Sequence, residues 1–188
     1  MRELYYGRHG QTFDLLTGHR SRRDTVLTKQ GWNEARRAGG LLVSLGISPS
    51  LIVCSELPRA VQSAGAVADV IGYDKDHILY EPLLNERLCG EAEGMLNLEI
   101  KQRWPGGFDT VPGAETAEVL QGRAAQAAAW LRKLDADVVL VIGHGTIGRA
   151  IVRDFENRPY TDEYNGERAL KNGQIVRLYP SPTIVLES

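Results

Sequence analysis

The run Val-Val-Leu-Val-Ile at residues 138–142 restricts the fold more than any other feature of the sequence. A continuous stretch of branched aliphatic side chains is typical of a strand buried on both faces, as in parallel sheets covered by helices. The run is far shorter than the ~20 residues that a helix needs to cross a bilayer. A further short strand is predicted at residues 3–6, and the short apolar run at residues 51–54 predicts another buried strand.

Helical segments alternate with these predicted strands. Helices are predicted over residues 29–45, 58–71, 114–134 and 146–155. Thr28, Ser55 and Thr146 are candidate N-caps, and Pro58 suits a first helical turn. The longest segment is rich in Ala, Leu, Glu, Gln and Arg, which favour helices. The alternation predicts an α/β fold, a three-layer α/β/α sandwich with a mostly parallel central sheet.

No repeat, low-complexity tract or linker interrupts the chain, and we interpret residues 1–188 as one domain. An irregular excursion at about residues 73–113 holds three prolines and a predicted short helix near residues 96–103. The turn signal Asn172-Gly173 predicts a hairpin ahead of a strand at residues 174–179. A last short strand is expected near residues 183–186.

The segment after Arg158, which includes Tyr160 and Tyr164, carries no motif that we can interpret. Folding, dimerisation and lid formation are its candidate roles.

Composition excludes several classes of protein. The chain is 43% hydrophobic and 24% charged, as soluble globular proteins are. A formal net charge of -2 gives no general attraction to nucleic acid or to an anionic membrane. The first residues lack a secretory signal pattern, so we expect a cytoplasmic protein. Cys54 and Cys89 have no CxxC spacing, which argues against a disulfide framework or a structural zinc site.

Basic side chains follow three of the predicted strands, at the carboxyl ends where ligands bind in parallel sheets. Arg8 and His9 follow the first strand, Arg59 follows the second, and His144 follows the valine-rich strand. A structural hydrogen-bonding role is the alternative for either histidine taken singly. The neighbouring arginines would repel a metal cation, so this grouping predicts an anion site.

Transfer of a phosphoryl group from a monoester needs a nucleophile, cationic donors on the phosphoryl oxygens and an acid for the leaving oxygen. A neutral imidazole can attack phosphorus and form a covalent phosphohistidine, which is the role we predict for His9. Arg8, Arg59 and His144 would then bind the phosphoryl group.

The acid must carry a proton at neutral pH. We therefore expect its pKa to be raised by burial or by the charge of the bound phosphate. Three glutamates close together in the sequence are candidates: Glu86, Glu91 and Glu93.

Six segments resemble, in the same order, recurring motifs of the histidine phosphatase superfamily, also called the phosphoglycerate mutase-like proteins. They lie at residues 8–12, 27–31, 55–64, 82–94, 112–115 and 143–145. The resemblance implies that His9 is phosphorylated, that Arg8 and Arg59 bind the phosphoryl group, and that His144 is the second catalytic histidine. It places Glu86 at the position of the acid.

The resemblance implies hydrolysis of a small phosphorylated metabolite, a small-molecule phosphate ester, without a metal or an organic cofactor. Predicted substrate-binding residues are Arg8, Arg59, His144, Gln11, Thr12, Arg20 and Arg22. Leu15 stands where the family often has an asparagine that touches the phosphoryl group, so Gln11 or a residue of the next loop is a candidate substitute. Gly7 replaces the usual aliphatic residue before Arg8.

Residues 18–24 contain Arg20, Arg22 and Arg23 and are interpreted either as a solvated loop or as a collar for a second anionic group of the substrate.

Two alternative functions remain open on the sequence. The first is a mutase, which would return the phosphoryl group to a substrate. Family mutases insert a basic segment where this chain has residues 95–112 with only Lys101 and Arg103, so hydrolysis is favoured. The second is a non-catalytic phosphate-binding relative, against which the full set of catalytic groups argues. A homodimer is possible, and neither nucleic acid nor a membrane is expected as a partner.

Overall fold

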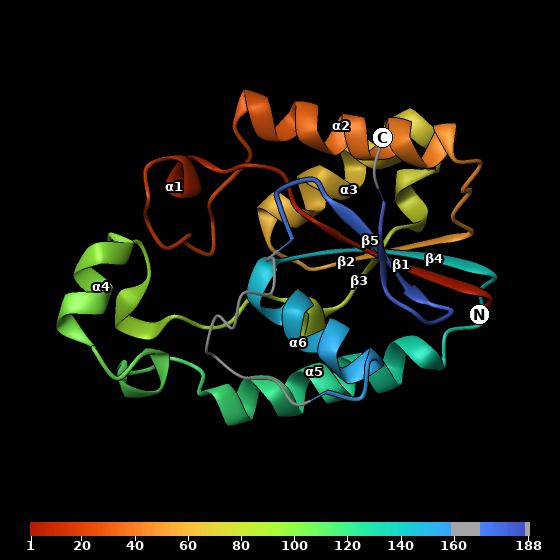
Figure 1. Cartoon of the computed structure of the whole chain (residues 1–188). Coiled ribbons are helices and arrows are strands. Elements are labelled where there is room, and N and C mark those ends of the chain that lie inside the picture. The colour runs from red at the N-terminus through yellow and green to blue at the C-terminus, as the bar shows by residue number, and fades with distance from the viewer. Residues whose placement is uncertain (159–169, 187–188) are drawn as a thin grey trace.

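A mixed sheet with the strand order β3-β2-β4-β1-β5-β6 forms the centre of the molecule (Figure 1). The computed structural model describes residues 1–158 and 170–186. The strands are β1 (Glu3–Arg8), β2 (Leu51–Cys54), β3 (Leu79–Tyr80), β4 (Val138–Gly143), β5 (Ile175–Tyr179) and β6 (Ile184–Val185). The first four pair in parallel, whereas β5 runs antiparallel to β1 and β6. The valine-rich strand β4 lies between β1 and β2.

Two helices cover each face of the sheet (Figure 1). They are α2 (Lys29–Ser44) and α3 (Pro58–Ile71) on one face, and α5 (Ala117–Arg132) and α6 (Gly145–Phe155) on the other. Successive residues of β1 point to opposite faces, so Tyr5 packs with the α2–α3 core and Tyr6 with the α5–α6 core. The predicted three-layer α/β sandwich is confirmed.

The remaining elements are short. They are α1 (Phe13–Leu16), α4 (Asn97–Arg103) and the 3-10 turns η1 (Lys75–His77), η2 (Pro82–Leu84), η3 (Gly90–Ala92) and η4 (Phe108–Thr110). The segments that carry α1 and α4 lie together beyond the carboxyl ends of the parallel strands (Figure 1). The backbone amide of Gly94 donates to the carbonyl of Arg20 at 2.9 Å, which joins the two segments over the sheet edge.

Several element boundaries differ from the predictions for local reasons. Helix α5 begins at Ala117 because the hydroxyl of Thr116 accepts from the amide of Val119 and caps the helix there. Helix α6 has His144, not Thr146, at its N-cap position. Ser55 caps no helix, since α3 begins after Leu57 without a side-chain cap.

The predicted hairpin at Asn172-Gly173 is wrong in its pairing. Gly173 adopts the left-handed backbone conformation of a turn, with φ 70°. Strand β5, which follows this turn, lies between β1 and β6 and pairs with both of them, not with a strand from before the turn. The segment before the turn includes residues 159–169, which are outside the described residues. Tyr160 and Tyr164 lie there too. Among the helices that the structure describes, none is long and apolar enough to cross a membrane.

Candidate active site

A cavity of about 190 Å³ opens where β1, β2 and β4 end. Its walls include Arg8, His9, Arg59 and Glu86. The parallel register explains how distant segments meet, because Arg8 lies beside Gly143, the residue before His144. Six arginines and two glutamates contribute to the lining, so the cavity has an excess of positive charge. This balance favours an anionic ligand.

His9 is held as a neutral imidazole. Its Nδ1 lies 2.7 Å from the carbonyl oxygen of Gly10, and because a carbonyl only accepts, Nδ1 carries the proton. The lone pair of the neutral ring is therefore on Nε2. Burial, followed by His144 and the cations of Arg59 and Arg8, holds the pKa of His9 well below its usual range. The ring can attack without first losing a proton.

His144 lies beside His9, with ring centroids 5.0 Å apart. Its Nε2 is 2.7 Å from Ser55 Oγ, and the Ser55 hydroxyl donates to Asn85 Oδ1 at 2.7 Å. Since that single hydroxyl proton is used, His144 Nε2 must be the donor to Ser55. Nδ1 of His144 is buried without a hydrogen-bond partner in the described part of the chain. Burial and the cations of Arg59 and Arg8 also lower the pKa of His144 well below its usual range.

Tyr6 is a residue of the site that the sequence did not reveal to us. Its hydroxyl donates to the carbonyl of His144 at 2.9 Å and accepts from the amide of His144 at 2.8 Å. Gly143 and Gly148 make room for this ring, because a Cβ at either position would overlap it. A glycine at a buried strand end and another in the following helix are the signal of close approach from which a bulky neighbour could have been inferred.

Arg8 and Arg59 both line the cavity, and each has a buried donor atom. Arg8 Nη1 donates to the carbonyl of Leu170 at 2.7 Å, and Arg59 Nη1 donates to the carbonyl of Arg22 at 2.9 Å. These bonds fix the guanidinium planes. The Nε atoms of Arg8 and Arg59 are buried and have no hydrogen-bond partner among the described residues. Burial lowers the pKa of both arginines, while Glu86 opposes the shift.

Glu86 is half-buried in the wall of the same cavity, but its ionisation differs from our expectation. Burial raises its pKa, yet three backbone amides outweigh that effect: those of Thr146, Arg87 and Ile147 donate at 3.0, 2.9 and 3.0 Å. Arg59 adds to them, and the pKa of Glu86 is lowered overall. The expectation of a raised pKa is wrong for this structure, because the carboxylate occupies the amino terminus of α6.

The other two candidate acids lie in different places. Glu93 lines the cavity, and its carboxylate accepts from the amide of Arg23. Glu91 points outward to Arg103, with 3.4 Å between Oε2 and Nη2. In residues 1–158 and 170–186, no three His, Cys, Asp or Glu side chains are grouped so that they could hold a metal ion.

The residues of the first two loops that we singled out from the sequence divide into those that line the cavity and those that do not. Arg20 and Arg23 line the cavity, and so does Leu15. Arg20 stacks its guanidinium on the ring of Phe108, 4.5 Å from the centroid. Its Nε is buried without a partner in the part of the chain that the structure describes.

Three predicted contacts do not reach the cavity. Arg22 Nη1 bonds to the buried carboxylate of Asp14 at 2.6 Å and so fixes its own loop. The Gln11 side chain accepts from the Thr28 hydroxyl at 2.9 Å, and the Thr12 hydroxyl caps α1. Gln11 is therefore no substitute for the donor that Leu15 lacks.

The two buried histidines predict a pH-dependent stability. In the unfolded chain they bind protons near pH 6.5, whereas in the fold they stay neutral well below it. The unfolded state binds more protons there, so the free energy of unfolding should fall as pH decreases from about 6.5. Each histidine contributes about 1.4 kcal/mol per pH unit.

Urea unfolding at pH values from about 7 to about 5 measures this slope. His144→Gln should flatten it, because it removes one of the two buried histidines. A slope that is unchanged in His144→Gln would contradict the assignment.

Comparisons with known proteins agree with this geometry. Residues 4–182 match the model of the histidine phosphatase superfamily (branch 1). A 2,3-bisphosphoglycerate-dependent phosphoglycerate mutase of Rhizobium etli is 31% identical over 181 residues, covering 86% of this chain and 84% of that relative. The corresponding mutase of Methylobacterium radiotolerans is 33% identical over 167 residues, covering 80% and 77%.

Solved structures share the fold. The alpha-ribazole phosphatase of Shigella flexneri superposes with a TM-score of 0.81 at 22% identity, covering 99% of this chain and 96% of that chain. A mycobacterial glucosyl-3-phosphoglycerate phosphatase gives a TM-score of 0.80 at 22% identity, covering 94% and 92%. With the sequence match over nearly its whole length, this chain is a member of branch 1 of the histidine phosphatase superfamily.

Proposed function

We propose that the protein hydrolyses phosphomonoesters through a phosphohistidine on His9. One observation carries the proposal: a buried neutral imidazole with its lone pair on Nε2 lines the same cavity as two arginines whose Nε atoms have no partner among the described residues. Such donors stabilise the charge of a phosphoryl group in transfer. The fixed guanidinium groups need no reorganisation during the reaction.

In the first step, His9 Nε2 attacks phosphorus and the bond to the ester oxygen breaks. The leaving oxygen takes the bonding electron pair and a proton from Glu86. A bound phosphoryl dianion raises the pKa of the nearby carboxylate, which offsets the backbone donors and lets Glu86 hold that proton. The same dianion favours a second proton on His144, at the Nδ1 atom without a partner in the described chain.

In the second step, Glu86 takes a proton from water, and the water oxygen attacks phosphorus. The bond between phosphorus and His9 Nε2 breaks, the lone pair returns to the ring, and inorganic phosphate leaves. Every group in these two steps belongs to the chain, so we expect turnover without added metal.

A phosphoglycerate mutase is the second candidate, because the relatives with about a third of their residues identical carry that name. The short stretch at residues 95–112, with α4 and η4, favours hydrolysis over the mutase reaction. A cytoplasmic location, a single domain and a homodimer remain predictions.

The test begins with para-nitrophenyl phosphate in the presence of a chelator. Turnover supports an enzyme, and its absence, with phosphate binding retained, would support the non-catalytic alternative. A phosphoglycerate supplied with its bisphosphate primer then separates the two reactions. Release of inorganic phosphate supports the phosphatase, and isomerisation without release would overturn it. A screen of phosphorylated metabolites identifies the substrate.

Arg20 supports a substrate with a second anionic group. Its guanidinium lies at the cavity wall, held on Phe108, with a buried Nε that lacks a partner among the described residues. Arg20→Ala should therefore raise KM for a sugar bisphosphate or a phosphorylated carboxylic acid by about 10-fold, the size of one charge-assisted hydrogen bond. KM for para-nitrophenyl phosphate should stay unchanged, because that substrate has no second anion. Arg103→Ala, on the exposed side of α4, is the matched control, and equal effects on both substrates would refute the subsite.

A further inference from the structure

We infer that the ion pair between Glu115 and Arg123 is a positioning device for the acid Glu86. The inference rests on the proposed function, since it assigns Glu86 the proton transfers of that reaction. Neither member of the pair lines the cavity. Both therefore act through the segment of chain that carries Glu86, and we call them positioning residues.

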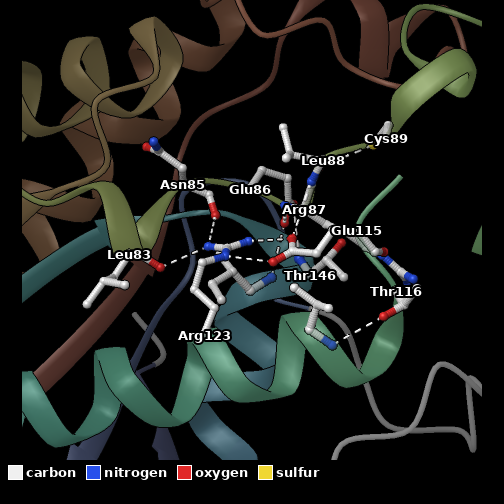
Figure 2. A network of polar contacts seen from close by, with 12 residues as sticks. Leu83, Asn85, Glu86, Arg87, Leu88, Cys89, Glu115, Thr116, Arg123 and Thr146 are labelled. Carbon is white, nitrogen blue, oxygen red and sulfur yellow. Dashed lines mark hydrogen bonds and ion pairs between the residues drawn. The ribbon is translucent and has the colours of Figure 1, made fainter. Parts of the chain in front are cut away.

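The pair itself has a fixed geometry (Figure 2). Arg123 Nε donates to Glu115 Oε1 at 2.8 Å, and Arg123 Nη2 donates to Oε2 at 2.7 Å. The Glu115 side chain is only 5% exposed, and that of Arg123 is 19% exposed. Two parallel bonds between a planar fork and a carboxylate hold both side chains in one orientation. Arg123 belongs to α5, whose packing against the sheet makes it a rigid support.

The pair then binds the main chain on both sides of Glu86 (Figure 2). On the side before it, Arg123 Nη1 donates to the carbonyls of Leu83 and Asn85 at 2.9 and 2.6 Å. On the side after it, the amide of Glu115 donates to the carbonyl of Leu88 at 3.0 Å. A further bond of 3.4 Å runs from the amide of Leu88 to Glu115 Oε2.

Glu86 needs such support because no helix or strand contains it. It lies between η2 and η3, in a stretch without regular backbone hydrogen bonds. Besides the bond from the amide of its neighbour Arg87, its carboxylate accepts from the start of α6, through the amides of Thr146 and Ile147. The bonds from the Glu115–Arg123 pair, which we call the clamp, and the contacts with α6 therefore hold the Glu86 carboxylate from two sides. Such support matters because a general acid must stay within reach of the proton that it transfers.

The same clamp is also connected to His144 through a chain of hydrogen bonds. The carbonyl of Asn85 is bound by Arg123, and the side chain of Asn85 accepts the hydroxyl proton of Ser55. Ser55 in turn accepts from His144. A shift of residue 85 would therefore disturb the acid and the second histidine together.

Only an arginine supplies all of these bonds. A lysine at residue 123 keeps the charge that balances buried Glu115, but its single ammonium cannot bind a carboxylate in parallel and two carbonyls at fixed directions. Arg123→Lys thus separates charge compensation from positioning.

The test is the dependence of kcat/KM on the leaving group. A series of substituted phenyl phosphates, from para-nitrophenyl to phenyl, increases the need for a proton on the leaving oxygen. For Arg123→Lys, Arg123→Gln and Glu115→Gln, the loss of kcat/KM should grow along the series and be about 10-fold larger for phenyl phosphate than for para-nitrophenyl phosphate. Glu86→Gln sets the maximum of this effect. Combining Glu86→Gln with Arg123→Lys should add no further dependence on the leaving group, because the two changes act on one group.

Arg132→Gln is the matched control, since Arg132 is on the same helix and pairs with Asp154 at the surface. It should leave the dependence on the leaving group unchanged. Circular dichroism verifies folding, and if Arg123→Gln fails to fold, Arg123→Lys decides the question. Equal losses across the series, or additive losses with Glu86→Gln, would show a merely structural role and overturn the inference. Absence of turnover in the unaltered protein would instead remove the proposed function and the inference with it.

Discussion

Replacing His9 with alanine should lower kcat by roughly 10⁴-fold or more, the scale of losing a catalytic nucleophile. Water would have to attack phosphorus directly, because no imidazole would remain at the position of His9 Nε2. The covalent intermediate should disappear as well. Intact-protein mass spectrometry after an alkaline quench, which preserves phosphohistidine, should show the added phosphoryl mass in the unaltered protein and none in His9→Ala.

The control for this result is the fold and the anion site. His9→Ala should retain its circular dichroism and bind inorganic phosphate, because the donors of Arg8 and Arg59 do not depend on the imidazole. His77→Ala, at an exposed histidine, should turn over normally. Near-normal activity of His9→Ala, or a phosphoryl group on another residue, would refute the assignment of the nucleophile.

Replacing Arg59 should give the second largest loss, about 10²–10³-fold in kcat/KM for Arg59→Ala, as when one preorganised donor to a developing charge is removed. The Arg59 side chain is buried and fixed by the carbonyl of Arg22, so solvent cannot easily replace it. Arg59→Lys should recover little of the loss, because one ammonium cannot bind that carbonyl and the phosphoryl group in the same directions.

Arg59 should also affect the pH profile. Its cation lowers the pKa of His9, so its removal lets that pKa rise. Protonated His9 has no lone pair for attack, and the acidic limb of kcat/KM should therefore move to higher pH in Arg59→Ala. Arg37→Ala, an exposed arginine of α2, is the control. An unshifted acidic limb would show that the charge of Arg59 does not act on the nucleophile.

The alternation of strands and helices along the chain could be predicted because these elements depend on local patterns. The run at residues 138–142 and the segment of α3 follow from hydrophobic pattern and from Pro58 at a first turn. The meeting of Arg8, His9, Arg59 and His144 followed from the rule that parallel strands present their carboxyl ends at one edge. No tertiary detail was needed for that step.

The details that escaped prediction depend on contacts between distant segments. The low pKa of Glu86 comes from amides at the start of α6, 60 residues further along the chain. The hydrogen bond from the Tyr6 hydroxyl to the carbonyl of His144 joins residues that are 138 positions apart in the chain. Arg20 and Arg22 belong to the same loop, yet Arg20 lines the cavity whereas Arg22 bonds to the buried carboxylate of Asp14.

The insertion of β4 between β1 and β2 has a consequence for the synthesis of the protein. Until residue 143 has left the ribosome, the strands that carry Arg8 and precede Arg59 have no common neighbour to hold them side by side. We therefore expect a nascent chain that ends before β4 to lack the assembled site. Because the site depends on contacts between residues far apart in sequence, we expect activity to arise late and to mature more slowly than helix formation, within milliseconds to seconds. The catalytic centre is thus a reporter of complete folding.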